Sequence, residues 1–288
     1  MAEEDPDRRH FARLLRAFRE ARGLSRADFG ALAGYSESTI KSFETGQRAV
    51  YEYHARHFDE AFGLLDNVFV HEASRFGKAG YSAAYGAFND VEQEAEDLYS
   101  FEHSLILGLF QTERYARAIT EIHPGTTKKV VDERVKARLD RRAVFDRVPV
   151  PLRVWSLVDE VALRCGVGGA SVMHEQLMYL VEESERPNVS IQVLPGAVGH
   201  AGRLGAFAIA ERSEHPSIVY LEHAADGSVT DDPAILKQMT LLFRSLQTRA
   251  LPKDASRDLI ARVDDERWKP SARTGARVLT AVATEETV

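Results

Sequence analysis

Positive charge that could bind an anionic partner is concentrated near the N-terminus. Residues 8–48 contain nine lysines and arginines against four acidic residues, which gives a net charge of +5, whereas residues 49–288 carry −8. A basic segment of this kind suits the phosphates of a nucleic acid. The net charge of −7 for the whole chain averages a basic head and an acidic body, so it does not exclude nucleic-acid binding.

Residues that could carry catalysis are few. The carboxylates Asp159 and Glu160 are adjacent at the end of a predicted strand, but neighbouring residues point apart and acid–base catalysis needs facing groups. The glycine-rich stretch Gly166–Ser171 lacks both the third glycine of a dinucleotide loop and the Gly-Lys-Ser/Thr of a P-loop. We therefore expect no catalytic residue, no cofactor and no enzymatic activity.

Three histidines and one arginine are candidate ligand-binding residues. His200 and Arg203 lie in the glycine-rich segment 199–205 and could hold an anion, although a flexible loop between strands explains the same composition. His54 and His57 are three residues apart on a predicted helix, but no cysteine or carboxylate is spaced to complete a metal site. We expect both to be surface histidines, and no bound metal.

The elements that position the basic residues are predicted to be helices. A first helix ends at Gly23, and Ser25 with Asp28 has the spacing of a capping box for a short second helix. Gly34 is placed to end that helix in a left-handed conformation, and Ser36 can cap a third. A fourth helix is expected over Tyr51–Phe62. The apolar residues expected to face the core of the first three helices are Phe11, Leu14, Leu15, Phe18, Phe29, Leu32, Ile40 and Phe43.

Two short helices joined through a glycine-containing turn, behind a basic amphipathic helix, are typical of a helix-turn-helix DNA-binding unit. The segment Leu24–Gly46 resembles the Xre family, the lambda-repressor type of this motif. Arg26 stands where that family usually has Gln, and arginine binds phosphate equally well. The resemblance implies base-reading residues Glu37, Ser38, Lys41 and Ser42, phosphate-contacting residues Ser25, Arg26 and Arg48, and a structural ion pair of Arg19 with Glu44.

Past residue 98 the pattern is mixed. Short β-branched or aromatic runs predict about four strands, and they cover Leu152–Val158, Val189–Leu194, Ala206–Ala210 and Ser217–Glu222. Residues 64–98 are expected to be helical. The acidic run Glu92–Asp97 is predicted to be a solvated helix face, the alternatives being a charge that repels misplaced nucleic acid or a partner site.

The fold class predicted is α+β: a lambda-repressor-like helical head over residues 8–75, a mixed body over 76–265 and a flexible tail over 266–288. The single cysteine, Cys165, cannot form an intrachain disulfide, and the acidic start is unlike a signal peptide. No stretch approaches 18 uninterrupted apolar residues. We therefore expect a cytoplasmic protein without a membrane partner.

Several ordered blocks of the body resemble the actinobacterial WhiJ-like regulators, in which an Xre-type head precedes a C-terminal domain of unassigned function. The blocks are Leu107–Arg117, Ala137–Arg142, Asp159–Leu163, Val167–Gly169, Glu175–Leu177, Pro187–Pro195, Gly205–Phe207 and Val219–Glu222. Where that family favours Pro-Gly-Leu-Leu-Gln-Thr, this chain has Leu107 and Phe110. The resemblance implies a small partner protein in an antitoxin-like arrangement.

The sequence thus predicts a transcriptional regulator that binds double-stranded DNA as a homodimer, with a body that senses a small-molecule effector or a small protein partner. Two alternatives stay open: an antitoxin-like protein-interaction module whose head only autoregulates, and an enzyme in the C-terminal domain with a vestigial head.

Overall fold

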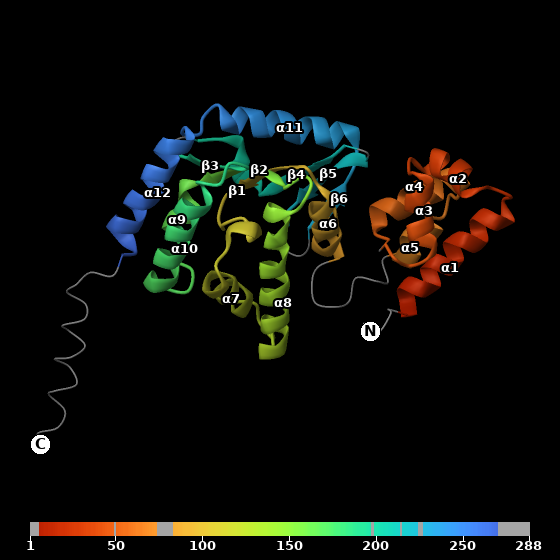
Figure 1. The fold of residues 1–288 in the computed structure, drawn as a ribbon, viewed down its shortest axis with the longest axis horizontal. Helices are drawn as coiled ribbons and strands as arrows, with labels where there is room; N and C mark the ends of the chain where they lie inside the picture. Colours follow the sequence, from red (N-terminus) through yellow and green to blue (C-terminus); the bar gives the residue numbers. More distant parts are fainter. Residues whose placement is uncertain are drawn as a thin grey trace, which may run out of the picture. The chain divides into compact units, whose positions relative to one another are not determined.

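Figure 1 shows the computed structural model of the chain, which describes residues 6–48, 50–73, 83–196, 199–213, 215–223 and 227–269. The chain divides into two compact units. The first combines residues 1–96 with 207–239, and the second combines 97–206 with 240–288. Most of the predicted flexible tail, from residue 270 onward, lies outside the described residues.

The described residues of the head form five helices, all in the first unit: α1 (Pro6–Ala21), α2 (Arg26–Ala33), α3 (Glu37–Glu44), α4 (Glu52–Phe62) and α5 (Val68–Ala73). The predicted caps are confirmed. Ser25 and Asp28 form a capping box at α2, Gly34 ends α2 with a φ of 76°, and the Ser36 hydroxyl accepts a hydrogen bond from the Thr39 N–H at the start of α3. Because each cap uses a backbone group that the helix leaves unpaired, the turn between α2 and α3 is fixed locally.

Aromatic side chains build the core of the head. Phe29 of α2 stacks on Phe62 of α4 with ring centroids 4.4 Å apart, and Phe11 of α1 meets Phe69 of α5 edge-on at 5.6 Å. The expectation that Leu32 faces this core is wrong, since Leu32 is 59% exposed. The buried residues of α2 are Phe29, Gly30 and Ala33, and a Cβ atom at Gly30 would lie 2.4 Å from the Tyr35 carbonyl oxygen. The buried face of α2 is therefore rotated toward the α2–α3 turn.

The rest of the first unit is a helix on an antiparallel set of strands. β4 (Phe207–Arg212) pairs with β5 (His215–Leu221), which pairs with β6 (Ser228–Thr230). The helix α6 (Ala83–Glu94) packs against β5 and β6, where Phe88 contacts Tyr220 at a ring distance of 5.3 Å. α11 (Pro233–Gln247) follows β6 and contributes its first residues to this unit.

The second unit contains three parallel strands. β1 (Asp97–Glu102) pairs with β2 (Arg153–Asp159), which pairs with β3 (Val189–Leu194). The buried hydroxyls of Ser100 and Ser156 face each other across β1 and β2 at 3.0 Å, in the register of the strands. The full strand order is β3-β2-β1-β4-β5-β6.

Helices and short 3-10 turns complete the second unit: η2 (Gly108–Phe110), α7 (Glu113–Glu121), α8 (Lys128–Asp140), η3 (Arg141–Asp146), α9 (Glu160–Arg164), α10 (Ala170–Glu183), η4 (Ala201–Leu204) and α12 (Lys253–Arg267). α7, α8 and α10 lie on one side of β1, β2 and β3 (Figure 1). The buried Gln176 amide of α10 accepts from the Thr112 N–H at 2.8 Å and donates to the Phe110 carbonyl at 2.7 Å. This amide therefore ties α10 to the segment that starts α7.

The α+β fold class is confirmed, with a helical region followed by a mixed sheet. The expected number of about four strands is low, because the sheet has six. β6 is only three residues long, and β1 begins inside the acidic run, so the expectation of helix up to residue 98 is wrong at Asp97 and Leu98. Within the described part of the chain, no helix is long and apolar enough to cross a membrane.

Candidate nucleic-acid interface

The helix α3 presents one polar face to solvent. Its apolar residues Ile40 and Phe43 are at most 1% exposed, whereas Glu37, Ser38 and Lys41 are exposed. This division follows from the helical period, because positions three apart share a face. The fourth residue of the predicted base-reading set, Ser42, is half-buried.

Local hydrogen bonds fix the two serines of this face. The Ser42 hydroxyl donates to the Ser38 carbonyl oxygen at 3.0 Å, and the Ser38 hydroxyl lies 2.9 Å from that of Ser36. Lys41 differs, since no hydrogen bond or ion pair holds its ammonium group among the described residues. Of the four predicted base-reading side chains, Lys41 therefore has the most freedom to bind an acceptor outside the protein.

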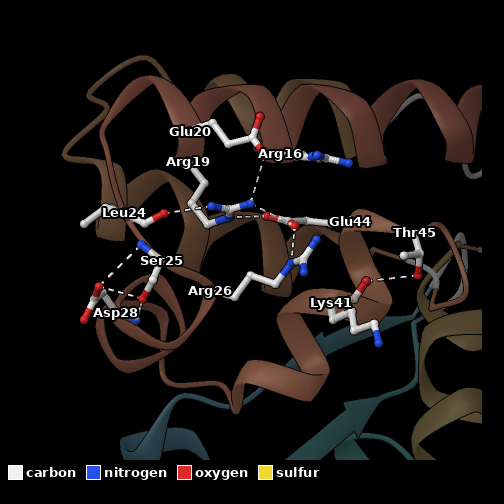
Figure 2. A network of polar contacts seen from close by, with 10 residues as sticks. All are labelled: Arg16, Arg19, Glu20, Leu24, Ser25, Arg26, Asp28, Lys41, Glu44 and Thr45. Carbon is white, nitrogen blue, oxygen red and sulfur yellow. Dashed lines mark hydrogen bonds and ion pairs between the residues drawn. The ribbon is translucent and has the colours of Figure 1, made fainter.

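A buried carboxylate joins three helices behind this face (Figure 2). The Glu44 side chain at the end of α3 is fully buried. Its Oε1 pairs with Arg19 Nε of α1, and its Oε2 lies 2.7 Å from Arg26 Nε of α2 and 3.2 Å from Arg19 Nη2. Arg19 Nη1 also donates to the Leu24 carbonyl at 2.7 Å. The hydrogen bond with Glu44 raises the pKa of the Arg19 guanidinium, so this side chain stays charged.

The three predicted phosphate contacts sit in different surroundings. The exposed Ser25 hydroxyl is occupied by the capping box, where it donates to Asp28 at 2.6 Å. The Arg26 side chain is 31% exposed and uses its Nε for Glu44, and its two terminal nitrogens form no hydrogen bond among the described residues. Arg26 can therefore bind a phosphate while Glu44 holds it in place.

Arg48, the third predicted phosphate contact, binds an acid of its own chain. Its Nη2 lies 2.5 Å from Oε2 of Glu94 at the end of α6, and its side chain is 21% exposed. Sequence reasoning missed Glu94. In the sequence, the contact is signalled only by the acidic run Glu92–Asp97. The expectation that this run is a solvated helix face is wrong, since Glu92 is fully buried and Asp97 belongs to β1.

The two histidines of α4 differ from the expectation of surface residues. His54 is 3% exposed, and its Nδ1 accepts a hydrogen bond from the Tyr51 N–H at 3.1 Å. Burial lowers the pKa of His54 well below 6.5, so the ring is neutral. His57 is half-buried, and its Nε2 lies 2.6 Å from Oδ2 of Asp231, a contact that raises its pKa. Among the described residues, no group of three His, Cys, Asp or Glu could hold a metal ion.

The predicted ligand loop of the second unit does not bring its two residues together. The His200 side chain is 1% exposed, with Nε2 2.9 Å from Oδ2 of Asp159 at the end of β2. Arg203 is exposed on the 3-10 turn η4, and its Nη2 donates to the Gly196 carbonyl at 3.4 Å. The Asp159 carboxylate beside His200 would repel an anion bound next to this histidine.

Comparison with known proteins gives two family matches. The family described as a helix-turn-helix domain matches residues 10–68. The family described as a domain of unknown function, DUF5753, matches residues 85–262, more than half of the chain. A comparison with curated proteins finds no match. The first match covers α2, α3 and the Glu44 network, and it indicates a DNA-binding regulator.

Changing Glu44 to Ala is expected to destabilise the head by about 3–5 kcal/mol, because Arg19 would remain buried without its counter-charge. Glu20→Ala is the matched control. Glu20 is an exposed acid that also contacts Arg19, at 3.4 Å, so its loss should change stability much less than the loss of Glu44. Chemical denaturation of both variants measures the difference, and equal losses would contradict the role of Glu44.

Acidification is expected to destabilise the head through His54. The folded protein keeps this ring neutral, whereas the unfolded chain takes up a proton below about pH 6.5, so stability is lost as the pH falls below that value. His54→Asn offers an acceptor to the Tyr51 N–H without titrating and should flatten the acid slope. His57→Asn is the contrast. In the unchanged protein the raised pKa of His57 stabilises the fold in acid, and this contribution disappears as the pH rises above 6.5. Calorimetric melting of both variants between pH 5 and 8 separates the contributions of the two histidines.

Proposed function

Since the chain belongs to the DUF5753 family and its N-terminal segment matches a helix-turn-helix domain, we propose that it is a sequence-specific transcriptional regulator of the Xre type. The observation that carries this proposal is the face of α3, where Lys41 and its polar neighbours are exposed while Ile40 and Phe43 anchor the helix in the core. Such a helix can enter the major groove and place its polar side chains against base edges.

The two kinds of DNA contact fall to different residues. Glu37, Ser38, Lys41 and Ser42 read bases from the exposed side of α3. Arg26 binds phosphate through its two terminal nitrogens, while its Nε stays bound to Glu44. Ser25 and Arg48 complete the backbone contacts. A regulator of this kind acts where the chromosomal DNA is, so the proposal includes a cytoplasmic location.

The body is proposed to sense rather than to catalyse. Its candidate catalytic groups have structural partners: Asp159 caps α9 and binds His200, and Glu160 binds the Gly196 N–H and Arg164. The blocks that resemble WhiJ-like regulators support a small-molecule effector or a small, antitoxin-like protein partner as the signal. Co-purification of such a protein partner with the full chain would favour the antitoxin-like hypothesis.

The base-reading role is tested by comparing two substitutions on two DNAs. Lys41→Ala should cost about 1–3 kcal/mol on the preferred operator, identified by selection from random DNA, and should hardly change binding to unrelated duplexes. Arg26→Ala should weaken binding to all sequences alike and flatten the dependence of log K on log salt by about one unit. If Lys41→Ala weakens binding equally on both DNAs, Lys41 does not read bases.

The size of α3 supports dimerisation, because one eight-residue helix covers too few bases for useful discrimination. We expect the full chain to sediment as a dimer and to bind a two-half-site operator far more tightly than either half-site alone. Sedimentation and titration of the same preparation check this, and a monomer with equal affinity for one and two half-sites would refute it.

A further inference from the structure

The helix α6 and Asp231, which directly follows β6, contact the head through three side-chain pairs among the described residues. Arg48 binds Glu94 at 2.5 Å, the Tyr51 hydroxyl hydrogen-bonds the Asp90 carboxylate, and His57 lies 2.6 Å from Asp231. The Tyr51 hydroxyl is also 3.3 Å from the Gly86 carbonyl oxygen. In each pair the head supplies the cation or the donor, and the other side supplies a carboxylate. We call these three pairs the acidic clasp.

Glu94 is fixed by the sheet as well as by the head. Its Oε2 lies 3.3 Å from Arg212 Nη1 on β4, and Arg212 Nη2 donates to the Pro216 carbonyl at 2.9 Å. The Arg212 side chain is only 5% exposed. The Glu94 carboxylate is therefore held in a defined place by a buried arginine, and Arg48 approaches it from the head.

Arg48 is also connected to α3, the helix proposed to read bases. Its backbone N–H donates to the Ser42 carbonyl at 3.1 Å, and its guanidinium lies over the Phe43 ring at 5.7 Å. A DNA phosphate bound by Arg48 Nη2 would have to displace the Glu94 carboxylate, and that carboxylate would repel a phosphate at the other guanidinium nitrogens.

We propose that Glu94 acts as an internal substitute for a DNA phosphate: it occupies Arg48 and restrains DNA binding until the acidic clasp opens. This inference rests on the proposed function. In this proposal, a change in the body alters DNA affinity through the contact between α6 and the head. Only phosphate contact is affected, so the restraint acts on every DNA sequence alike.

The test is Glu94→Gln in the full chain, with binding to the operator and to an unrelated duplex titrated over a series of salt concentrations. We expect tighter binding to both DNAs, about three- to tenfold, and a salt slope steeper by about one unit, because one more phosphate contact forms. The control is Glu52→Gln, which removes the same charge from an exposed residue of α4 paired with Arg56. It should change binding much less.

The second arm repeats Glu94→Gln with Arg48→Ala. Without Arg48, Glu94→Gln should no longer tighten DNA binding. Tighter binding that persists in the double variant overturns the inference. It is also overturned if Glu94→Gln alone tightens binding no more than Glu52→Gln does. Weaker binding by Glu94→Gln also overturns it, since Glu94 would then be positioning Arg48 for DNA. Melting without DNA of the unchanged chain, Glu94→Gln, Arg48→Ala and the double variant reports the Arg48–Glu94 coupling independently. If that coupling is present and no protein binds duplex DNA, the proposed function has failed, and the inference with it.

Discussion

The carboxylate of Glu44 is the constraint on which the arrangement of the head depends. It is fully buried and neutralised by Arg19 from α1 and Arg26 from α2, while its own backbone ends α3. A buried charge is tolerated only with such partners. Because Arg19 binds both carboxylate oxygens and Arg26 binds Oε2, the three helices are joined through one side chain. The exposed face of α3 is thereby held at a fixed angle to the rest of the head.

Local chemistry made much of the head predictable. Ser25, Asp28 and Ser36 act on backbone groups within three residues, and glycine at position 34 supplies the left-handed turn that other residues rarely adopt. The burial of His54 was also accessible, since it lies one turn before Phe58 and shares its face. The exposure of Leu32 was not. The buried residues of α2 are Phe29, Gly30 and Ala33, a set that the apolar spacing of Phe29 and Leu32 does not predict.

The contacts of the acidic clasp lie beyond any local pattern. Arg48 and Glu94 are 46 residues apart, and His57 and Asp231 are 174 apart. Charge counting separates a basic head from an acidic body, but it cannot show that three acids of the body face three side chains of the head. The strands β2 to β5 were predictable from runs of β-branched residues, whereas β1 and β6 become strands because neighbouring strands pair with them.

The first unit is built from two pieces of chain that the ribosome delivers at different times. Residues 97–206 separate α6 from β4, and at roughly 5–20 residues per second their synthesis takes on the order of ten seconds. During that interval the head can fold, but α6 lacks the strands against which Phe88 packs, and Glu94 lacks Arg212. A nascent chain therefore carries a completed head before Arg212 can fix Glu94 and before Asp231 is made. A chain cut short within residues 97–206 would never acquire these two residues or a complete acidic clasp.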